Sequence, residues 1–234
     1  ESKREDIVVE KYAKSLTLES VAKWGATVAI EKTDDAFMVE LQNKVLKDFY
    51  TFLKTGTLKG TQKKWQKALA IAKGAVLNKF AGMNRNVTEV VGFANVMDFY
   101  DWLGDKEITV QTMFGLQYIK DFFGFSTLFL LPDDYIPAKT VIATPVENID
   151  LYYIDPGDSD FKKLGLDYTT SGETNLIGFH AGGNYTNATG ETYAIMGMKL
   201  WAEYLDGICV VTVGTTETIP EVSSTVSKAS SNGK

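Results

Sequence analysis

The chain contains one histidine, His180, so any chemistry that needs an imidazole depends on this residue. A Ser-His-Asp triad would have to use it, but no Gly-x-Ser-x-Gly elbow is present to carry the nucleophile. Side chains alternate along a strand, which would place His180 on the same face as Leu176 and Gly178. We therefore expect His180 to be a structural residue and not a catalytic base.

The sequence also gives little support for a metal-binding or cofactor-binding site. The single Cys209 lies in the apolar run 208–211, which indicates a buried small hydrophobic residue and excludes an internal disulfide. One His and one Cys also exclude zinc sites built from several such ligands. Residues 155–160 (DPGDSD) resemble a calcium loop, but Leu166 stands where a closing Glu is needed, so we interpret them as an acidic turn. No nucleotide-binding glycine motif occurs. The sequence predicts no catalytic, cofactor-binding or metal-binding residue.

Residues 178–193 (GFHAGGNYTNATGETY) combine several turn-forming residues. Gly182 and Gly183 permit a sharp change of direction, including positive φ, and residues 184–190 are typical of a turn. Asn-x-Thr triplets begin at Asn86, Asn184 and Asn187. They would matter as glycosylation sites only on a secretory route, and we interpret them as chance occurrences in a chain rich in Asn and Thr.

The charge is unevenly distributed. The formal net charge is -6, which argues against a general nucleic-acid binder. Residues 44–79 hold nine Lys and one acid, whereas residues 133–173 hold nine acids and three Lys. Two interpretations remain open. These segments form solvated faces, or they form complementary patches that meet between copies of the chain.

The first half of the chain carries the helix signals. Apolar residues recur every four residues from Phe37 to Leu53, after candidate N-caps at Thr33, Asp34 and Asp35, which predicts a helix over residues 35–53. A second helix is expected over about 61–80. A strand is expected over 86–93, followed at once by a helix that Asn95 caps and that ends before Gly104.

Strand signals dominate afterwards. Strands are predicted over 126–131, 140–144, 148–154, 176–180, 193–200 and 207–213, with a turn at 133–138 and a polar loop at 155–170. Residues 1–33 are expected to form an extended arm and a loop, with a hairpin over 21–30 turning at Gly25. Residues 214–234, rich in Ser and Thr, are expected to form a flexible tail. The predicted class is α+β, with no membrane-spanning segment.

Several runs carry a resemblance to a known family. They are VTEVVGFAN at 87–95, LFLLPDDYIPAKTVIA at 128–143 with its continuation TPVENIDLYY at 144–153, and the strand pair within 191–213. With these runs, the chain resembles the major capsid proteins of tailed bacteriophages, of the Hong Kong 97-like fold and the Gram-positive siphophage type. The resemblance covers about residues 32–213.

The resemblance implies a domain order. Residues 1–33 would be an N-terminal arm and extended loop, and 34–60 the spine helix of a peripheral domain. Residues 61–155 would be an axial domain, 156–213 the return to the peripheral domain, and 214–234 the tail. Family members that crosslink use a Lys and an Asn, and neither partner can be identified in this sequence. Residues 182–190 are expected to contact a neighbouring subunit.

The resemblance also implies a function. The chain would be a structural subunit and not an enzyme, assembling with itself as hexamers and pentamers into an icosahedral head around double-stranded DNA, which it would hold without sequence-specific binding. Scaffolding and portal proteins, with an optional decoration protein, would be its partners. It would need no cofactor or membrane, and it would assemble in the bacterial cytoplasm and reside in the virion. The alternatives are an encapsulin-type nanocompartment shell and a cell-surface binding module, in which His180 and the Asn-x-Thr sites would matter.

Overall fold

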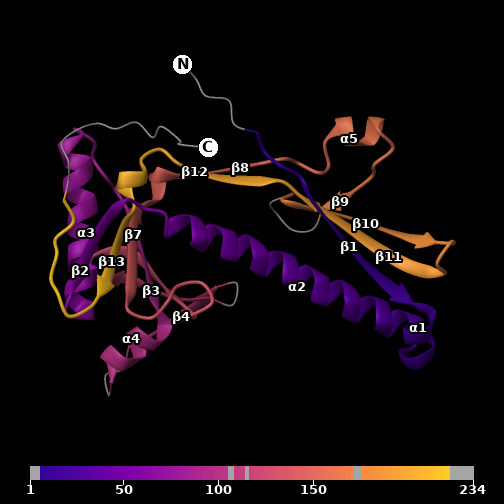
Figure 1. Ribbon diagram of the computed structural model, residues 1–234, viewed down its shortest axis with the longest axis horizontal. Helices are drawn as coiled ribbons and strands as arrows, with labels where there is room; N and C mark the ends of the chain where they lie inside the picture. Colours follow the sequence, from indigo (N-terminus) through magenta and orange to yellow (C-terminus); the bar gives the residue numbers. More distant parts are fainter. Residues whose placement is uncertain (1–5, 105–107, 114–115, 171–174, 222–234) are drawn as a thin grey trace. The chain divides into compact units, whose positions relative to one another are not determined.

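The computed structural model describes residues 6–104, 108–113, 116–170 and 175–221. The chain divides into two compact units, and each is made of segments that are distant in sequence. The first unit comprises Glu1–Val45 and Leu151–Leu200, and the second comprises Leu46–Asp150 and Trp201–Lys234. Figure 1 labels most of the helices and strands.

The first unit is built on a four-stranded antiparallel sheet in the order β1-β11-β10-β9. The strands are β1 (Glu10–Thr17), β11 (Thr189–Met196), β10 (Ile177–Asn184) and β9 (Thr169–Thr170). The helices are α1 (Leu18–Trp24), the long α2 (Ala26–Leu53), which continues into the second unit, and the short α5 (Ser159–Lys163). Another strand pair, β8 (Ile149–Tyr153) with β12 (Met198–Ala202), forms a two-stranded sheet.

One face of the four-stranded sheet packs on α2. Phe37 and Leu41 of the helix are buried against Ile177, Ala194 and Met196 of the strands. The rings of Phe37 and Phe179 meet edge to face, with their centroids 6.3 Å apart. The spacing of four between Phe37 and Leu41 places both on one helix face, which explains why this stretch is helical and where it docks.

The second unit is built on a seven-stranded mixed sheet in the order β2-β13-β7-β3-β6-β5-β4. Its strands are β2 (Leu58–Gln62), β13 (Cys209–Val213), β7 (Thr140–Pro145), β3 (Val90–Asn95), β6 (Phe125–Leu131), β5 (Leu116–Phe122) and β4 (Gln111–Met113). The pairs β13–β2 and β3–β6 are parallel, and the others are antiparallel. The remaining elements are α3 (Trp65–Gly82), α4 (Val96–Leu103) and two 3-10 turns, η1 (Val146–Asn148) and η2 (Leu205–Gly207).

Both faces of this sheet are covered. On one face, Leu69 and Val76 of α3 pack with Ala94 of β3 and Val141 of β7 in a large core. A second core contains Tyr50 and Leu53 from the end of α2, together with sheet residues that include Phe93, Leu131 and Ile142. Neighbours in sequence such as Phe93 and Ala94 belong to different cores because side chains alternate across a strand.

The helix predicted over 35–53 begins earlier, at Ala26. The hairpin predicted over 21–30 is wrong, since α1 and the start of α2 occupy these residues. Gly25 separates the two helices with φ of 81°, and its N–H donates to the carbonyl of Val21, so this glycine closes one helix where the predicted turn was placed. Thr33 lies inside α2 and donates its hydroxyl to the carbonyl of Ala29, so it is not a cap.

The helix predicted over 61–80 begins at Trp65, because Thr61 and Gln62 belong to strand β2. The capped helix after β3 is confirmed. The side chain of Asn95 accepts a hydrogen bond from the N–H of Met97, and Gly104 follows the helix with φ of 53°. The side chain of Asn95 also donates to the carbonyl of Ile136, so the cap is tied to the turn after β6.

Among the strands, the predictions near β6, β7, β8 and β13 are confirmed within about two residues. The predicted strand over 193–200 is divided at Gly197 into β11 and β12. Strands β1, β2, β4 and β5 were not predicted, and residues 10–17 of the expected arm lie inside a sheet. The predicted loop over 155–170 contains α5 and β9. The α+β class is confirmed.

The expected turn near residues 182–190 lies further along the chain. Gly182 and Gly183 continue strand β10, where they pair with Glu191 and Gly190, and neither has a positive φ. The ladder ends at the pair Asn184 and Thr189, so the connection is only residues 185–188.

The structure describes residues 214–221 of the expected tail, and part of this segment packs on the second unit. Thr218 exchanges two backbone hydrogen bonds with Thr61, at 3.1 and 2.8 Å, and Pro220 is buried. A flexible tail is therefore wrong for Thr218 and Pro220, because the backbone of Thr218 pairs with the outer edge of β2 and Pro220 is buried. Residues 222–234 of the predicted tail, and 1–5 of the predicted arm, lie outside the described residues.

Candidate assembly surfaces

His180 lies on β10 with its side chain exposed. Its Nδ1 is 2.9 Å from the carbonyl oxygen of Asp167, which requires the proton on Nδ1, and the ring meets Tyr168 edge to face. Within the described residues, no carboxylate or hydroxyl is hydrogen-bonded to this imidazole. The geometry fits the structural role expected from the sequence.

Cys209 is completely buried, and burial raises the pKa of its thiol to about 12. A thiolate nucleophile is therefore strongly disfavoured. Two carboxylates of the DPGDSD segment accept hydrogen bonds from backbone N–H groups within the segment. Asp155 accepts from the N–H of Gly157 at 2.8 Å, and Asp158 accepts from the N–H of Asp160 as the N-cap of α5. No group of three or more His, Cys, Asp or Glu in the described part of the chain could hold a metal ion.

One ion pair lies in the interior of the second unit. Lys79 is only 3% exposed, and its Nζ lies 2.5 Å from Oδ2 of Asp206. Oδ1 of Asp206 is buried without a hydrogen-bond partner in the described structure. The pair joins the end of α3 to η2, and its removal from solvent indicates a structural role.

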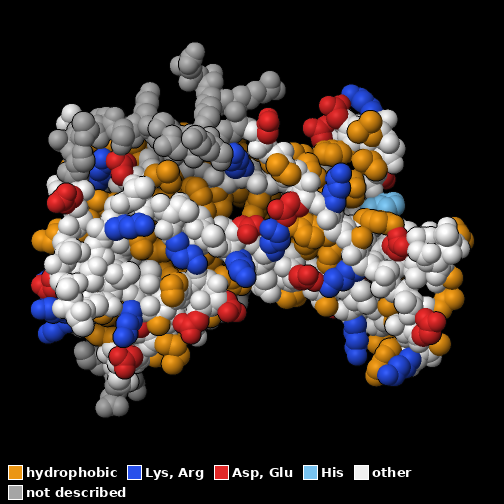
Figure 2. All heavy atoms as spheres, in the orientation of Figure 1, with side chains coloured by type: hydrophobic (Ala, Val, Ile, Leu, Met, Phe, Trp, Pro, Cys, Tyr) orange, Lys and Arg blue, Asp and Glu red, His pale blue; other side chains and the backbone are white. Residues whose placement is uncertain are grey.

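The Lys-rich segment does not form a single basic face. Lys44 lies 3.1 Å from Glu10 in the first unit, whereas Lys67 lies 3.0 Å from Glu217 in the second. Lys59, Lys63 and Lys64 are exposed near the start of α3. Figure 2 shows Lys and Arg side chains interspersed with acidic ones over the visible face of each unit. Complementary patches between copies therefore remain a prediction.

The acid-rich segment 133–173 is likewise distributed over both units. Several of its carboxylates have partners within the chain. Asp133 accepts from the side chain of Asn95 at 2.6 Å, and Asp160 pairs with Lys163 at 2.7 Å. Four of the nine acidic residues therefore cap turns and helices or pair nearby, which reduces the charge available for a distant partner.

Large apolar side chains are exposed on the first unit. Leu18 and Trp24 of α1 are 62% and 57% exposed, and Val28 and Ile30 follow at the start of α2. Three consecutive residues of β8, Leu151, Tyr152 and Tyr153, are also exposed, and Tyr185 is 99% exposed. The second unit also exposes large apolar side chains, among them Met97 and Ile219, and such residues mark a partner-binding surface where they form a contiguous patch.

The four-stranded sheet also has an open edge. All eight residues of β1 pair with β11 on one side, and no strand in the described part of the chain pairs with the other side. An open edge presents unpaired N–H and C=O groups to which another chain can add. The sequence analysis predicted neither the strand β1 nor the full exposure of Tyr185. For Tyr185, the only indication in the sequence is that one aromatic residue stands within a polar turn.

The helices in the described residues include none long and apolar enough to cross a membrane. The surfaces described above have no arrangement for catalysis, but they have apolar residues and strand edges that another protein chain would cover.

Comparison with known proteins gives a result at the level of structure only. No protein-family model and no curated protein match the sequence. The structure is similar to a chain of Mycobacterium phage Che8, at 9% identity and a TM-score of 0.55, covering 87% of this chain and 70% of that one. It is also similar to a chain of the SrpI encapsulin complex from Synechococcus elongatus PCC 7942, at 10% identity and a TM-score of 0.54, covering 88% and 74%.

A third similar structure is a virus-like particle from Pyrococcus furiosus, at 14% identity and a TM-score of 0.52, covering 88% of this chain and 76% of that one. At such low identities the similarity concerns the fold. The α+β arrangement of the two units and these neighbours agree with the resemblance found in the sequence: the chain has the Hong Kong 97-like fold.

Proposed function

We propose that the chain is a shell-forming structural protein, and specifically the major capsid protein of a tailed bacteriophage. The observation that carries the proposal is a Hong Kong 97-like fold whose exposed features suit another chain and not a substrate. An open β1 edge and the exposed side chains of Leu18, Trp24 and Tyr185 leave the first unit with surface to bury. Burial of such surface drives association.

The proposal assigns roles to the parts of the fold. Residues 34–60, which include most of helix α2, are the spine helix of the peripheral domain, residues 156–213 return to that domain, and residues 61–155 are the axial domain. Axial domains would gather as hexamers and pentamers, and peripheral domains would join these into a closed icosahedral shell. Scaffolding and portal proteins would act during assembly in the bacterial cytoplasm, and a decoration protein could bind later.

The phage assignment is preferred over an encapsulin-type compartment because of the sequence runs at 87–95 and 128–153. A net charge of -6 also suits a container for DNA, since a strongly basic wall would bind the genome tightly and in a salt-dependent way. The similarity to the SrpI encapsulin complex makes the encapsulin shell the second candidate.

Two measurements test the proposal. Sedimentation of the purified protein, alone and with the scaffolding protein from its source, should give particles of megadalton mass. A protein that stays monomeric at high concentration in both cases contradicts the proposal. Nuclease treatment of particles from the source then separates the candidates. Protected genome-length DNA supports the phage head, whereas particles that hold protein cargo and no DNA support the encapsulin type.

A further inference from the structure

Between α2 and the four-stranded sheet, buried side chains pack around Phe37, whereas a groove remains near the start of α2. In the sheet, residues of β1, β11 and β10 that pair with one another form rows across the three strands, and alternate rows face α2. The first row, Tyr12, Ala194 and Phe179, packs against Phe37 of α2 in the core of the first unit. The third row is Leu16, Gly190 and Gly183. A Cβ atom added at either glycine would meet no atom within 4 Å, so the sheet has nothing there to reach the helix.

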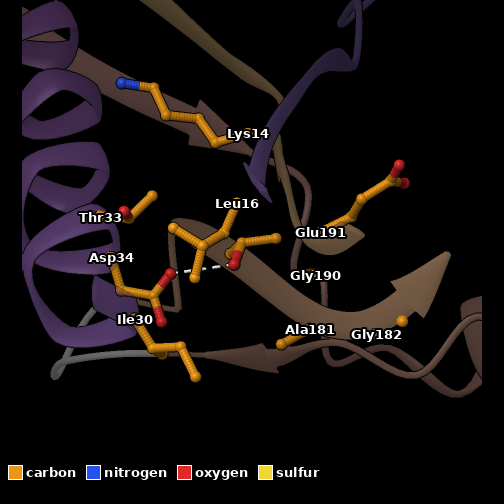
Figure 3. A pocket seen from close by; sticks show the side chains of 11 residues that line it. Lys14, Leu16, Ile30, Thr33, Asp34, Ala181, Gly182, Gly190 and Glu191 are labelled. Carbon is orange, nitrogen blue, oxygen red and sulfur yellow. Dashed lines mark hydrogen bonds between the residues drawn. The ribbon is translucent and has the colours of Figure 1, made fainter. Parts of the chain in front are cut away.

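The result is a groove of about 340 Å³ between the start of α2 and the sheet, shown in Figure 3. Leu16 and Ile30 project into it and form its apolar walls, while the glycines form a flat floor. The polar residues of the lining include Asp34, which accepts a hydrogen bond from the hydroxyl of Thr192 at 2.9 Å, together with Lys14, Thr33 and Glu191. The groove therefore combines apolar walls with hydrogen-bonding groups, and it suits a flat side chain that carries a polar tip.

The first unit also presents such a side chain. Tyr185 is 99% exposed at the tip of the β10–β11 hairpin, and its side chain has no contact partner among the described residues. Trp24 is different, because its ring already packs under the ammonium groups of Lys23 and Lys32. Tyr185 is thus a large aromatic residue that the described part of the chain leaves almost fully exposed.

The turn that carries Tyr185 is rigidly built. The side chain of Asn184 accepts from the N–H of Thr186 at 3.0 Å and donates to Glu191 at 2.8 Å. Glu191 also accepts from the hydroxyl groups of Thr189 and Tyr193. A preorganised turn loses little conformational entropy when its side chain is buried by a partner, so an anchor held this way binds efficiently.

We propose that Tyr185 of one copy inserts into the groove lined by Leu16, Ile30, Gly183 and Gly190 of a second copy. The groove accepts the ring between its apolar walls, and Thr33 and Asp34 lie where they can bond the phenol hydroxyl. The occupant is a second copy because the anchor and the receptor belong to the same chain and each is left open in it. This inference rests on the proposed function, since it supplies one of the contacts that a shell requires.

Disulfide trapping tests the contact directly. The variant Thr186→Cys with Ile30→Cys places one thiol beside the anchor and one at the groove, and it leaves Tyr185 intact. The native Cys209 is buried and does not compete. Oxidised particles should give a ladder of linked chains on a non-reducing gel. The control variant Leu164→Cys with Ile30→Cys, which uses an exposed residue outside the hairpin, should stay a single-chain band.

Two further variants separate docking from folding. Gly183→Val fills the groove, whereas Gly182→Val adds the same side chain to the opposite face of the same strand. Neither glycine has a positive φ, and Val favours strands, so both variants should melt no lower than the parent. We expect Gly183→Val to reduce the ladder at least tenfold and Gly182→Val to preserve it. Tyr185→Ser should reduce it as Gly183→Val does.

The outcomes distinguish this contact from the proposed function. Particles that form normally but give no ladder with the Thr186 and Ile30 pair overturn the contact and leave the shell function standing. A ladder that survives both Tyr185→Ser and Gly183→Val also overturns it. Unmodified protein that forms no particles under any condition contradicts the shell function itself, and with it the contact.

Discussion

The two units of the chain differ in how completely their sheets are covered by other elements of the chain. The seven-stranded sheet of the second unit has a packed core on both faces, with α3 on one and the end of α2 on the other. The four-stranded sheet of the first unit packs on α2 through one small core, and it keeps an open edge, an unfilled groove and an exposed tyrosine. The sheet of the second unit is therefore covered on both faces by its own chain, whereas the sheet of the first unit leaves a groove and one strand edge uncovered within the described residues.

Titratable groups with strongly raised pKa values occur in both units. Burial is the largest cause for the thiol of Cys209 and the phenol of Tyr50 in the second unit, and for the phenol of Tyr12 in the first. The exposed features of the first unit are apolar side chains and backbone edges.

The buried ion pair gives the largest expected effect in the second unit. Asp206→Leu leaves the ammonium group of Lys79, which is 3% exposed, buried without this carboxylate, so it should lower the free energy of unfolding by about 3 to 5 kcal/mol. Denaturant titration measures the loss. The double variant Lys79→Met with Asp206→Leu should recover most of it. Equal losses in the single and double variants would show that the pair is not the cause.

A matched pair of leucines compares the two units directly. Leu69 lies in the larger core of the second unit, and Leu41 lies in the small core of the first, and both are buried. Leu69→Ala should lower the free energy of global unfolding by about 2 to 5 kcal/mol. Leu41→Ala should mainly accelerate hydrogen exchange in β10 and β11 while β3 and β7 stay protected. Uniform loss of protection in the Leu41 variant would contradict the division into unlike units.

Cys209 tests how closed the second unit is. Cys209→Ser places a hydroxyl in the core without a designed partner and should cost about 1 to 3 kcal/mol, with Cys209→Ala as the control for lost volume. Because burial raises the pKa of the thiol to about 12, the stability linked to this group is present below the unfolded pKa of about 8.5 and is lost as the pH rises toward 12. Labelling of the native thiol at pH 8 should therefore be slow and should follow unfolding. Rapid labelling of folded protein would mean that the core opens.

Hydrogen exchange at β1 gives the smallest expected effect. Amides of β1 that point away from β11 should exchange quickly in the monomer, because no described strand covers them. In assembled particles these amides should slow at least tenfold, equivalent to about 1.4 kcal/mol, if another chain covers the edge. Amides of β3, in the centre of the other sheet, should change little. Unchanged exchange at β1 in particles would show that this edge stays open.

Some local signals could be interpreted from the sequence alone, whereas distant strand pairings could not. Asn95 and Gly104 mark the ends of α4 through contacts with their own neighbours, so their roles could be predicted. Strand β1 has few apolar residues and becomes a strand by pairing with β11, which lies far along the chain. The start of α2 was misplaced because Thr33 and Asp34 look like caps, whereas Asp34 bonds Thr192 of the sheet instead.

The same limit applies to the assembly surfaces. The sequence indicated that residues 182–190 form a turn that would meet a neighbour, but the glycines proved to be strand residues that shape a groove. Their role depends on the distance between sheet and helix, which no local pattern encodes. The exposure of Tyr185 likewise follows from the length of the β10–β11 ladder.

Electron microscopy of the purified protein, assembled with the scaffolding protein from its source, tests the central claim most directly. The proposed function predicts closed shells of uniform size, in which averaged images resolve clusters of six and five subunits. Monomers alone, or open filaments without closed particles, would contradict it.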